Sequence, residues 1–444
     1  MKRIGELDIL ITGGTALTMS EKMEVIENPR IGIKDRKIVF AEKETGRPAR
    51  YKAKETIDAS GSIIMPGLIN THIHSPMVCF RGLADDLPLM EWWNNHIFPA
   101  ESKHVNREMV YHGAMLAIAE MILSGTTTFS DVYFYESSVA RAAIDSGIRA
   151  LSTQGIIDSP APNNLEPSRK IEIAEKFIKK WTGVSPLITP ALSCHTPFTC
   201  STETLTLIKE VARKANVPYM IHLAETIDET KIIRERYGTT PVRYLHRLGI
   251  LDDFTIAVHC VCIDKEEIDI LADCGVKVSH NPESNMKLAS GVAPIPKLLK
   301  KGVTVGLGTD GCASNNDLDM FREMDTAAKI HKATTGDPTV MDAKTVLRMA
   351  TIEGAKVLNL EDKTGSIEAG KCADIIILDM QKPHLTPLYN YYSQIVYSAS
   401  GSDVSTSIID GKIVMKERRL LNMDIESIME RVRKIADVIS SNNL

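Results

Sequence analysis

The stretch PGLINTHIHSP, residues 66–76, marks the point where the pattern of the chain changes. Before it, apolar and polar residues alternate between Gly, Asp and Pro turns, which is typical of short β-strands. After it, short apolar runs alternate with longer stretches of helical period, the pattern of βα units around a parallel sheet. The sequence therefore predicts an α/β domain that begins at this stretch.

Eight apolar runs follow one another from this point. They are GLINTHIH, TTTFSD, ALSTQGII, LITPALSCH, YMIHLA, TIAVHC, VKVSH and VTVGLGTD. Credible helices separate them, among them residues 107–125, which end at Gly125, and residues 201–216, which open with Ser201 or Thr202 as the N-cap. Since eight parallel strands close a barrel, we expect a (β/α)8 TIM-like barrel.

The strand pattern returns after about residue 365, so we expect both ends of the chain to build one small composite β-sandwich. The predicted division is residues 1–65 for the first part of the sandwich, 66–364 for the barrel, and 365–444 for the second part and a C-terminal helix. That helix begins behind a possible N-cap, Asp424. Its apolar stripe consists of Ile425, Ile428, Met429, Val432, Ile435 and Ile439. The stripe predicts docking against the protein rather than membrane insertion.

The composition favours a small-molecule substrate. The 444 residues include 52 basic and 57 acidic side chains, with a net charge of -5. Because no basic face stands out, we expect no nucleic-acid or membrane partner. The N-terminal residues read as a strand rather than a signal peptide, and no apolar run is long enough to span a bilayer. Most of the eight cysteines lie in apolar runs, which predicts reduced thiols and a cytoplasmic location.

Polar residues end several of the predicted strands. In a parallel barrel the carboxyl ends of the strands surround the active site. His72 and His74 are two residues apart on one strand, so their side chains point the same way, although such a pair also arises by chance. His222 and Asp310 end later runs. Three imidazoles and a carboxylate suit zinc with an open position for water, whose pKa would fall to about 7. The sequence thus predicts a metal-activated hydrolase.

Two further residues are candidates for catalysis beside Asp310. Glu225 follows His222 by three residues and is placed to move protons between water and substrate; the alternative is a glutamate that caps the next helix. His259 has three interpretations: a buried structural histidine, a further metal ligand, or a group that orients the hydroxide and stabilises charge at the attacked carbon. We favour the third.

The segments PGLINTHIH, HLAET, SHNPESNMKLASG, GLGTDGCASNNDLDM and GSIEAGKCADIIILD resemble the amidohydrolase superfamily. The resemblance covers nearly the whole chain and is closest to 5'-methylthioadenosine/S-adenosylhomocysteine deaminases. It implies one metal ion, usually zinc, with Fe²⁺ or Mn²⁺ as alternatives. The implied ligands are His72, His74, His222 and Asp310. It also implies a homo-oligomer. Binuclear relatives carry a lysine at the end of the fourth strand, where this chain has His195, so we expect a single metal.

The same resemblance assigns roles in deamination. Glu225 would carry a proton from water to purine N1, Asp310 would orient the attacking hydroxide, and His259 would steady the tetrahedral intermediate. Glu101 would hold the ribose and His195 would contact the sugar side; the alternatives are a solvated glutamate and a core histidine. Trp92, with its neighbour Trp93, is a candidate for an apolar wall or for the core.

One position departs from the family pattern. Some members bind the carboxylate of S-adenosylhomocysteine through an arginine after the third strand, where this chain has Gln154; Arg169 is a second candidate for that contact. We therefore expect uncharged 5'-modified adenosines, such as 5'-methylthioadenosine, 5'-deoxyadenosine or adenosine itself, to be favoured over S-adenosylhomocysteine. The alternatives are a guanine deaminase, an s-triazine chlorohydrolase or deaminase, and, more remotely, a non-catalytic scaffold.

Overall fold

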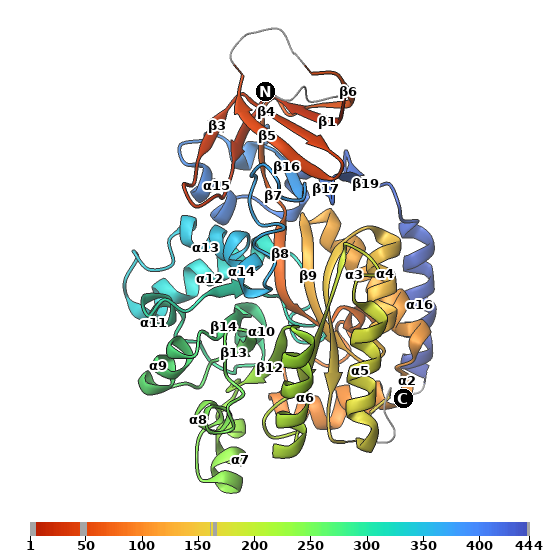
Figure 1. Cartoon of the computed structure of the whole chain (residues 1–444), viewed down its shortest axis with the longest axis vertical. Coiled ribbons are helices and arrows are strands. Elements are labelled where there is room, and N and C mark those ends of the chain that lie inside the picture. Colours follow the sequence, from red (N-terminus) through yellow and green to blue (C-terminus); the bar gives the residue numbers. More distant parts are fainter. Residues whose placement is uncertain (1–5, 45–50, 160, 163–166, 442–444) are drawn as a thin grey trace.

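A computed structural model describes residues 6–44, 51–159, 161–162 and 167–441 of the chain. Figure 1 shows two parts. A β-rich part lies at the top of the view, and below it lies a larger part in which helices surround strands. The predicted residue ranges of the domains remain a prediction. Their outermost residues, 1–5 and 442–444, lie outside the described residues.

The larger part is the predicted barrel. Within the described residues, eight parallel strands form one sheet in the order β15-β14-β13-β12-β11-β10-β9-β8. The strands are β8 (Leu68–Ile73), β9 (Thr126–Tyr133), β10 (Arg149–Ile156), β11 (Ile188–Cys194), β12 (Tyr219–Leu223), β13 (Thr255–His259), β14 (Lys277–His280) and β15 (Val305–Leu307). Each coincides with one of the eight predicted runs. The sequence order of the strands is their spatial order, which confirms the predicted TIM-like fold.

The first and last strands close the barrel through individual hydrogen bonds. Asp310 N donates to His72 O at 3.0 Å, and Thr71 Oγ1 donates to Leu307 O at 2.9 Å. Gly308 permits this approach, because a Cβ at that position would lie only 2.8 Å from the His72 nitrogen. The closure therefore brings the residues that follow β15 against the histidines of β8.

Helices cover the outside of the barrel (Figure 1). The helices between and after the barrel strands are α3 (Arg107–Leu123), α4 (Glu136–Ser146), α5 (Lys170–Trp181), α6 (Thr202–Ala215), α7 (Ile227–Tyr237), α8 (Pro241–Arg247), α9 (Lys265–Asp273), α10 (Pro282–Lys287), α11 (Ile295–Lys300), α12 (Met320–Thr335), α13 (Ala343–Met349) and α14 (Ile352–Val357). Ser201 caps α6, accepting a hydrogen bond from Thr204 N, as the sequence predicted. Gly125, just beyond α3, takes a left-handed φ of 88°.

The smaller part is a sandwich built from both ends of the chain, as predicted. One sheet has the order β5-β4-β1-β6 and the other β19-β18-β17-β16-β7-β2-β3. The strands are β1 (Leu7–Thr12), β2 (Thr15–Leu17), β3 (Val25–Glu27), β4 (Pro29–Lys34), β5 (Lys37–Lys43), β6 (Ala53–Asp58), β7 (Ser62–Pro66), β16 (Ile375–Asp379), β17 (Val404–Ile409), β18 (Lys412–Lys416) and β19 (Arg419–Leu420). Isoleucines from both sheets form its buried core, including Ile11, Ile33, Ile64 and Ile375.

The stretch that opens the barrel also joins it to the sandwich. Pro66 pairs with Ile375 in the sandwich, and two residues later Leu68 pairs with Thr126 in the barrel. The chain therefore leaves the sheet of the sandwich and enters the sheet of the barrel within two residues. The chain passes between them without a long linker, which couples the orientation of β8 to the sandwich.

The C-terminal helix α16 (Ile425–Ser441) packs on the barrel helix α3 rather than on the sandwich (Figure 1). Asp424 Oδ1 accepts a hydrogen bond from Ser427 N at 3.2 Å, which confirms the predicted N-cap. Ile428, Val432 and Ile439 of the predicted stripe are buried. No helix within the described residues has the length and apolar character needed to cross a membrane.

Short helices lie between β8 and α3, and further short helices follow β16. The first group is η1 (Ser75–Phe80), α1 (Leu89–Glu91), η2 (Trp92–Ile97) and α2 (Phe98–His104). The others are η3 (Pro167–Arg169), before α5, and η4 (Pro383–Leu385), α15 (Tyr391–Tyr397) and η5 (Gly401–Asp403) in the last part of the chain. The segment η2 is a π-helix, a rare form that is frequent at functional sites. It carries both Trp92 and Trp93.

Candidate active site

The predicted metal ligands converge at the carboxyl ends of the barrel strands. His72 lies in β8, His74 follows it, His222 lies in β12 and Asp310 follows β15. His72 Nε2 is 3.4 Å and His74 Nε2 is 3.3 Å from Asp310 Oδ1. His222 Nε2 is 3.2 Å from His72 Nε2. The donor atoms of His72, His74 and Asp310 lie within 4.8 Å of one another, as do those of His72, His222 and His259. Two such groups that share His72 fit a divalent metal ion.

Backbone carbonyls fix the orientation of two of these rings. His74 Nδ1 lies 2.6 Å from Val132 O, and His222 Nδ1 lies 2.9 Å from His195 O. Because a carbonyl only accepts, each Nδ1 carries the proton and each Nε2 presents its lone pair to the other ligands. The ligands are therefore held in the tautomer that binds a metal.

Burial and charge put three of these groups, His72, His222 and Asp310, in the protonation states that bind a metal. Burial lowers the pKa of His72 to about 4 and that of His222 well below its usual value, so both imidazoles are neutral. Burial alone would raise the pKa of Asp310, but its hydrogen bond to His72 and the neighbouring histidines hold it well below the usual range. Ser284 Oγ also donates to Asp310 Oδ2 at 2.7 Å.

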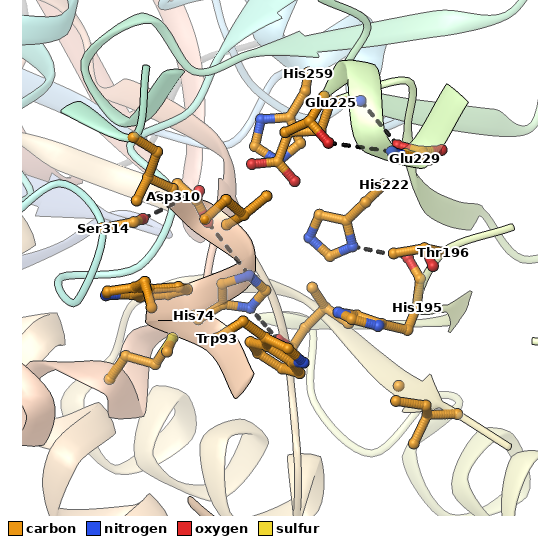
Figure 2. Close-up of a pocket in the computed structure, with 18 of the residues that line it drawn as sticks. His74, Trp93, His195, Thr196, His222, Glu225, Glu229, His259, Asp310 and Ser314 are labelled. Atoms are coloured by element: carbon orange, nitrogen blue, oxygen red, sulfur yellow. Dashed lines mark hydrogen bonds and ion pairs between the residues drawn. The ribbon is translucent and has the colours of Figure 1, made fainter. Parts of the chain in front are cut away.

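Glu225 and His259 lie next to the ligands (Figure 2). His259 Nε2 is 3.8 Å from Glu225 Oε2, and His259 Nδ1 is 2.9 Å from Asn285 Oδ1. Burial raises the pKa of Glu225. A raised pKa makes a carboxylate a better proton acceptor.

Three residues at these strand ends have a left-handed backbone. Ala224 has a φ of 52°, His259 of 75° and Asp310 of 60°. A side chain makes this conformation costly, so it persists only where surrounding contacts impose it. The turns that carry the functional groups are thus shaped at the expense of local backbone stability.

Glu101 and His195 lie on the other side of the same pocket. Glu101, in α2, is 1% exposed and accepts a 2.6 Å hydrogen bond from Tyr133 OH, while its second oxygen has no partner among the described residues. Burial raises the pKa of Glu101 to about 8. His195 stacks on Trp93, with ring centroids 5.4 Å apart.

The remaining wall of the pocket is largely apolar. Trp92 lines it, as do Leu89, Met90, Trp93, Phe134, Ile156, Ile157, Phe198 and Leu288. Gln154 and Arg169 are not among the lining residues. The Gln154 amide donates to Gly155 O, and Arg169 pairs with Glu172. Gly155 lines the pocket in place of its neighbour Gln154, and it was not predicted from the sequence.

This architecture and ligand arrangement match a known family. The model of the amidohydrolase family matches residues 63–414. The chain belongs to the amidohydrolase family. This confirms the resemblance found in the sequence.

Individual relatives of this amidohydrolase are similar over almost their full length. It is 47% identical over 431 residues to a 5-methylthioadenosine/S-adenosylhomocysteine deaminase of Syntrophus aciditrophicus, covering 97% of each chain. It is 46% identical over 431 residues to a 5'-deoxyadenosine deaminase of Methanosarcina acetivorans, covering 97% of this chain and 98% of the other. A crystal structure of an adenosine deaminase from Xanthomonas campestris with bound zinc superposes with a TM-score of 0.96 at 37% identity, covering 98% and 99% of the two chains.

Proposed function

We propose that this amidohydrolase is a zinc-dependent deaminase that converts 5'-modified adenosines to the inosine analogues and ammonia. The observation that carries the proposal is the position of Glu225, beside the metal-binding side chains and in the same pocket as Glu101. Protonation of a ring nitrogen and recognition of a ribose require two such carboxyl groups. The names of the relatives at 46–47% identity agree with this substrate class.

One zinc ion per chain is proposed, held by His72, His74, His222 and Asp310, with Fe²⁺ or Mn²⁺ as alternatives. The mixed nitrogen and oxygen donors suit a borderline ion. When bound, it would supply a water activated for attack near neutral pH. The end of β11 offers His195 and no lysine to bridge a second metal ion.

Glu225 would move the proton. Its carboxylate takes a proton from the attacking water and passes it to purine N1, so that C6 becomes electrophilic as the new C–O bond forms. Asp310 orients the water, and His259 stabilises the charge that develops on the oxygen of the tetrahedral intermediate. The C6–N bond then breaks and the amino group leaves as ammonia, with its added proton supplied by the same water. The raised pKa of Glu225 supports this shuttle.

Glu101 and His195 would bind the sugar. The free oxygen of Glu101 is buried and without a described partner, so a ribose hydroxyl would satisfy it. The stack of His195 on Trp93 supports a fixed ring at the sugar side, with Trp92 as part of the apolar wall. The fixed groups and the flat apolar surface together suit a nucleoside.

The 5'-substituent is proposed to be uncharged. No Lys or Arg is found among the described residues that line the pocket. A homocysteine carboxylate would therefore enter without a cation to pair it, at a cost in binding. Gln154 and Arg169 remain candidate contacts for a longer substituent that extends out of the pocket.

A cytoplasmic location and a homo-oligomeric state also remain predictions.

A panel of substrates tests the function. Purified protein would be incubated with 5'-methylthioadenosine, 5'-deoxyadenosine, adenosine, S-adenosylhomocysteine, guanine and an s-triazine, and released ammonia and kcat/KM would be measured for each. We expect the uncharged 5'-modified adenosines to rank first and S-adenosylhomocysteine to rank below them. Preferential turnover of guanine or the triazine would instead assign the site to another heterocycle.

A further inference from the structure

A second glutamate, Glu229, lies behind Glu225. It is in the first turn of α7, is 3% exposed and borders the pocket. Its Oε1 accepts a hydrogen bond from Ala224 N at 3.0 Å, and its Oε2 accepts one from Glu225 N at 2.9 Å. Figure 2 marks the contact between Glu229 and Glu225. One carboxylate therefore binds the two successive backbone amides that link β12 to Glu225.

This arrangement departs from the usual cap of a helix. Thr226 is the N-cap of α7 and Glu229 is the third helical residue, the spacing of a capping box. In a capping box the glutamate accepts from the backbone amide of the N-cap residue. Here Glu229 reaches one and two residues further back, beyond Thr226. Its carboxylate therefore holds the turn that precedes the helix.

The next βα unit gives an internal comparison. Asp264 caps α9, and Glu267 at the corresponding position accepts from Asp264 N at 2.8 Å, which completes an ordinary capping box. Glu267 is 2% exposed, so both glutamates are buried. Glu267 serves its own helix, whereas Glu229 serves the turn before the helix.

The turn held by Glu229 is one of the three strand ends with a left-handed backbone. Ala224 has a φ of 52°, a conformation that L side chains rarely adopt. Another backbone contact of this turn comes from the segment after β13, where Cys262 N donates to Ala224 O at 2.8 Å. We therefore expect loss of the carboxylate to release Ala224 from this conformation and to shift the Glu225 side chain.

We propose that Glu229 is a positioning residue that acts through Glu225. Its two hydrogen bonds to the amides of Ala224 and Glu225 fix the position of the Glu225 carboxylate in the pocket. This inference rests on the proposed function of Glu225 as the proton carrier. Glu229 itself forms no bond to substrate. Displacement of a reacting group by about 1 Å can cost about 100-fold in rate.

The test is a double-mutant cycle with 5'-methylthioadenosine as substrate. Glu229→Gln keeps the size of the side chain but has one carbonyl acceptor for two amides. We expect kcat to fall about 10–100-fold with KM and metal content little changed. Glu225→Gln/Glu229→Gln should be no slower than Glu225→Gln, because a misplaced shuttle no longer matters once the shuttle is absent. Full additivity of the two losses, or a kcat unchanged in Glu229→Gln, would overturn the proposal.

Glu267→Gln is the matched control. It removes an equally buried capping glutamate, so it should lower the melting temperature without the loss in kcat.

Hydrogen exchange of the amides of Ala224 and Glu225 gives a measurement that needs no substrate. Exchange should accelerate in Glu229→Gln and not in Glu267→Gln. If Glu229→Gln fails to fold, Ala224→Gly/Glu229→Gln replaces it, because glycine adopts the left-handed conformation freely. Unchanged exchange in Glu229→Gln, or in Ala224→Gly/Glu229→Gln where that variant replaces it, would refute the proposal. A wild type inactive on every adenosine derivative would refute the proposed function alone.

Discussion

His72 Nε2 and Asp310 Oδ1 lie 3.4 Å apart, although they come from the first and the last strand regions of the barrel. The hydrogen bond from Asp310 N to His72 O closes the barrel at the same place. Barrel closure and assembly of the metal-binding side chains are therefore the same structural event.

The metal should be required for turnover. A chelator should remove the metal and abolish ammonia release, and added zinc should restore it. His74→Ala should show the same loss without restoration, since one of the converging donors is gone. His246→Ala, on the exposed surface of α8, is the control and should keep the metal. Full activity in a protein shown to be free of metal would be incompatible with the proposed site.

Glu225→Gln should retain the metal and lose activity. The side chain is not among the predicted ligands, but the amide cannot carry a proton to the substrate. We expect kcat to fall by about 10²–10⁴, the usual contribution of a general acid–base group. Metal content and kcat would be measured on the same preparation, with the exposed Glu235→Gln of α7 as the control. A Glu225→Gln protein with near-normal kcat would exclude the shuttle.

Glu101 should make the stability of the protein depend on pH. Burial raises its pKa from 4.5 to about 8, so between these values the folded protein binds a proton that the unfolded chain releases. The free energy of unfolding should therefore fall as the pH rises from about 4.5 to about 8. Glu101→Gln should flatten this slope in urea titrations. The exposed carboxyl group of Glu172 has a pKa of about 2, so Glu172→Gln should leave this slope unchanged.

Arg149 should hold the barrel to the sandwich. Its guanidinium donates to both oxygens of Asp374, at 2.7 and 3.1 Å, and both side chains are buried. Arg149→Met leaves this carboxylate unpaired, so we expect a loss of about 3–5 kcal/mol in the free energy of unfolding. Arg141→Met, at an exposed ion pair on α4, should change it by less than about 0.5 kcal/mol. Equal midpoints of urea unfolding for the two variants would contradict this role.

The barrel and its metal-binding residues could be predicted because their physical signals are local. Buried parallel strands are short apolar runs, and polar residues such as His222 and Asp310 stand out where such a run ends. The N-caps Ser201 and Asp424 were found for the same reason, since a cap depends on a few neighbouring residues.

Features that depend on packing between distant segments were not predictable from the pattern. The alternation of β10 shows that Gln154 and Gly155 face opposite ways, but only the assembled barrel determines which of them lines the pocket. The π-helix that carries Trp92 and Trp93 has no distinctive sequence signature. For Glu229, the Thr-x-x-Glu spacing was present in the sequence, yet its reach to Ala224 depends on the strained turn.

Ammonia release from 5'-methylthioadenosine by purified, zinc-loaded protein tests the central claim most directly. The metal site and Glu225 together predict one ammonia and one molecule of the inosine analogue for each nucleoside consumed. A folded protein with its zinc in place that releases no ammonia from any adenosine derivative would contradict the proposed function.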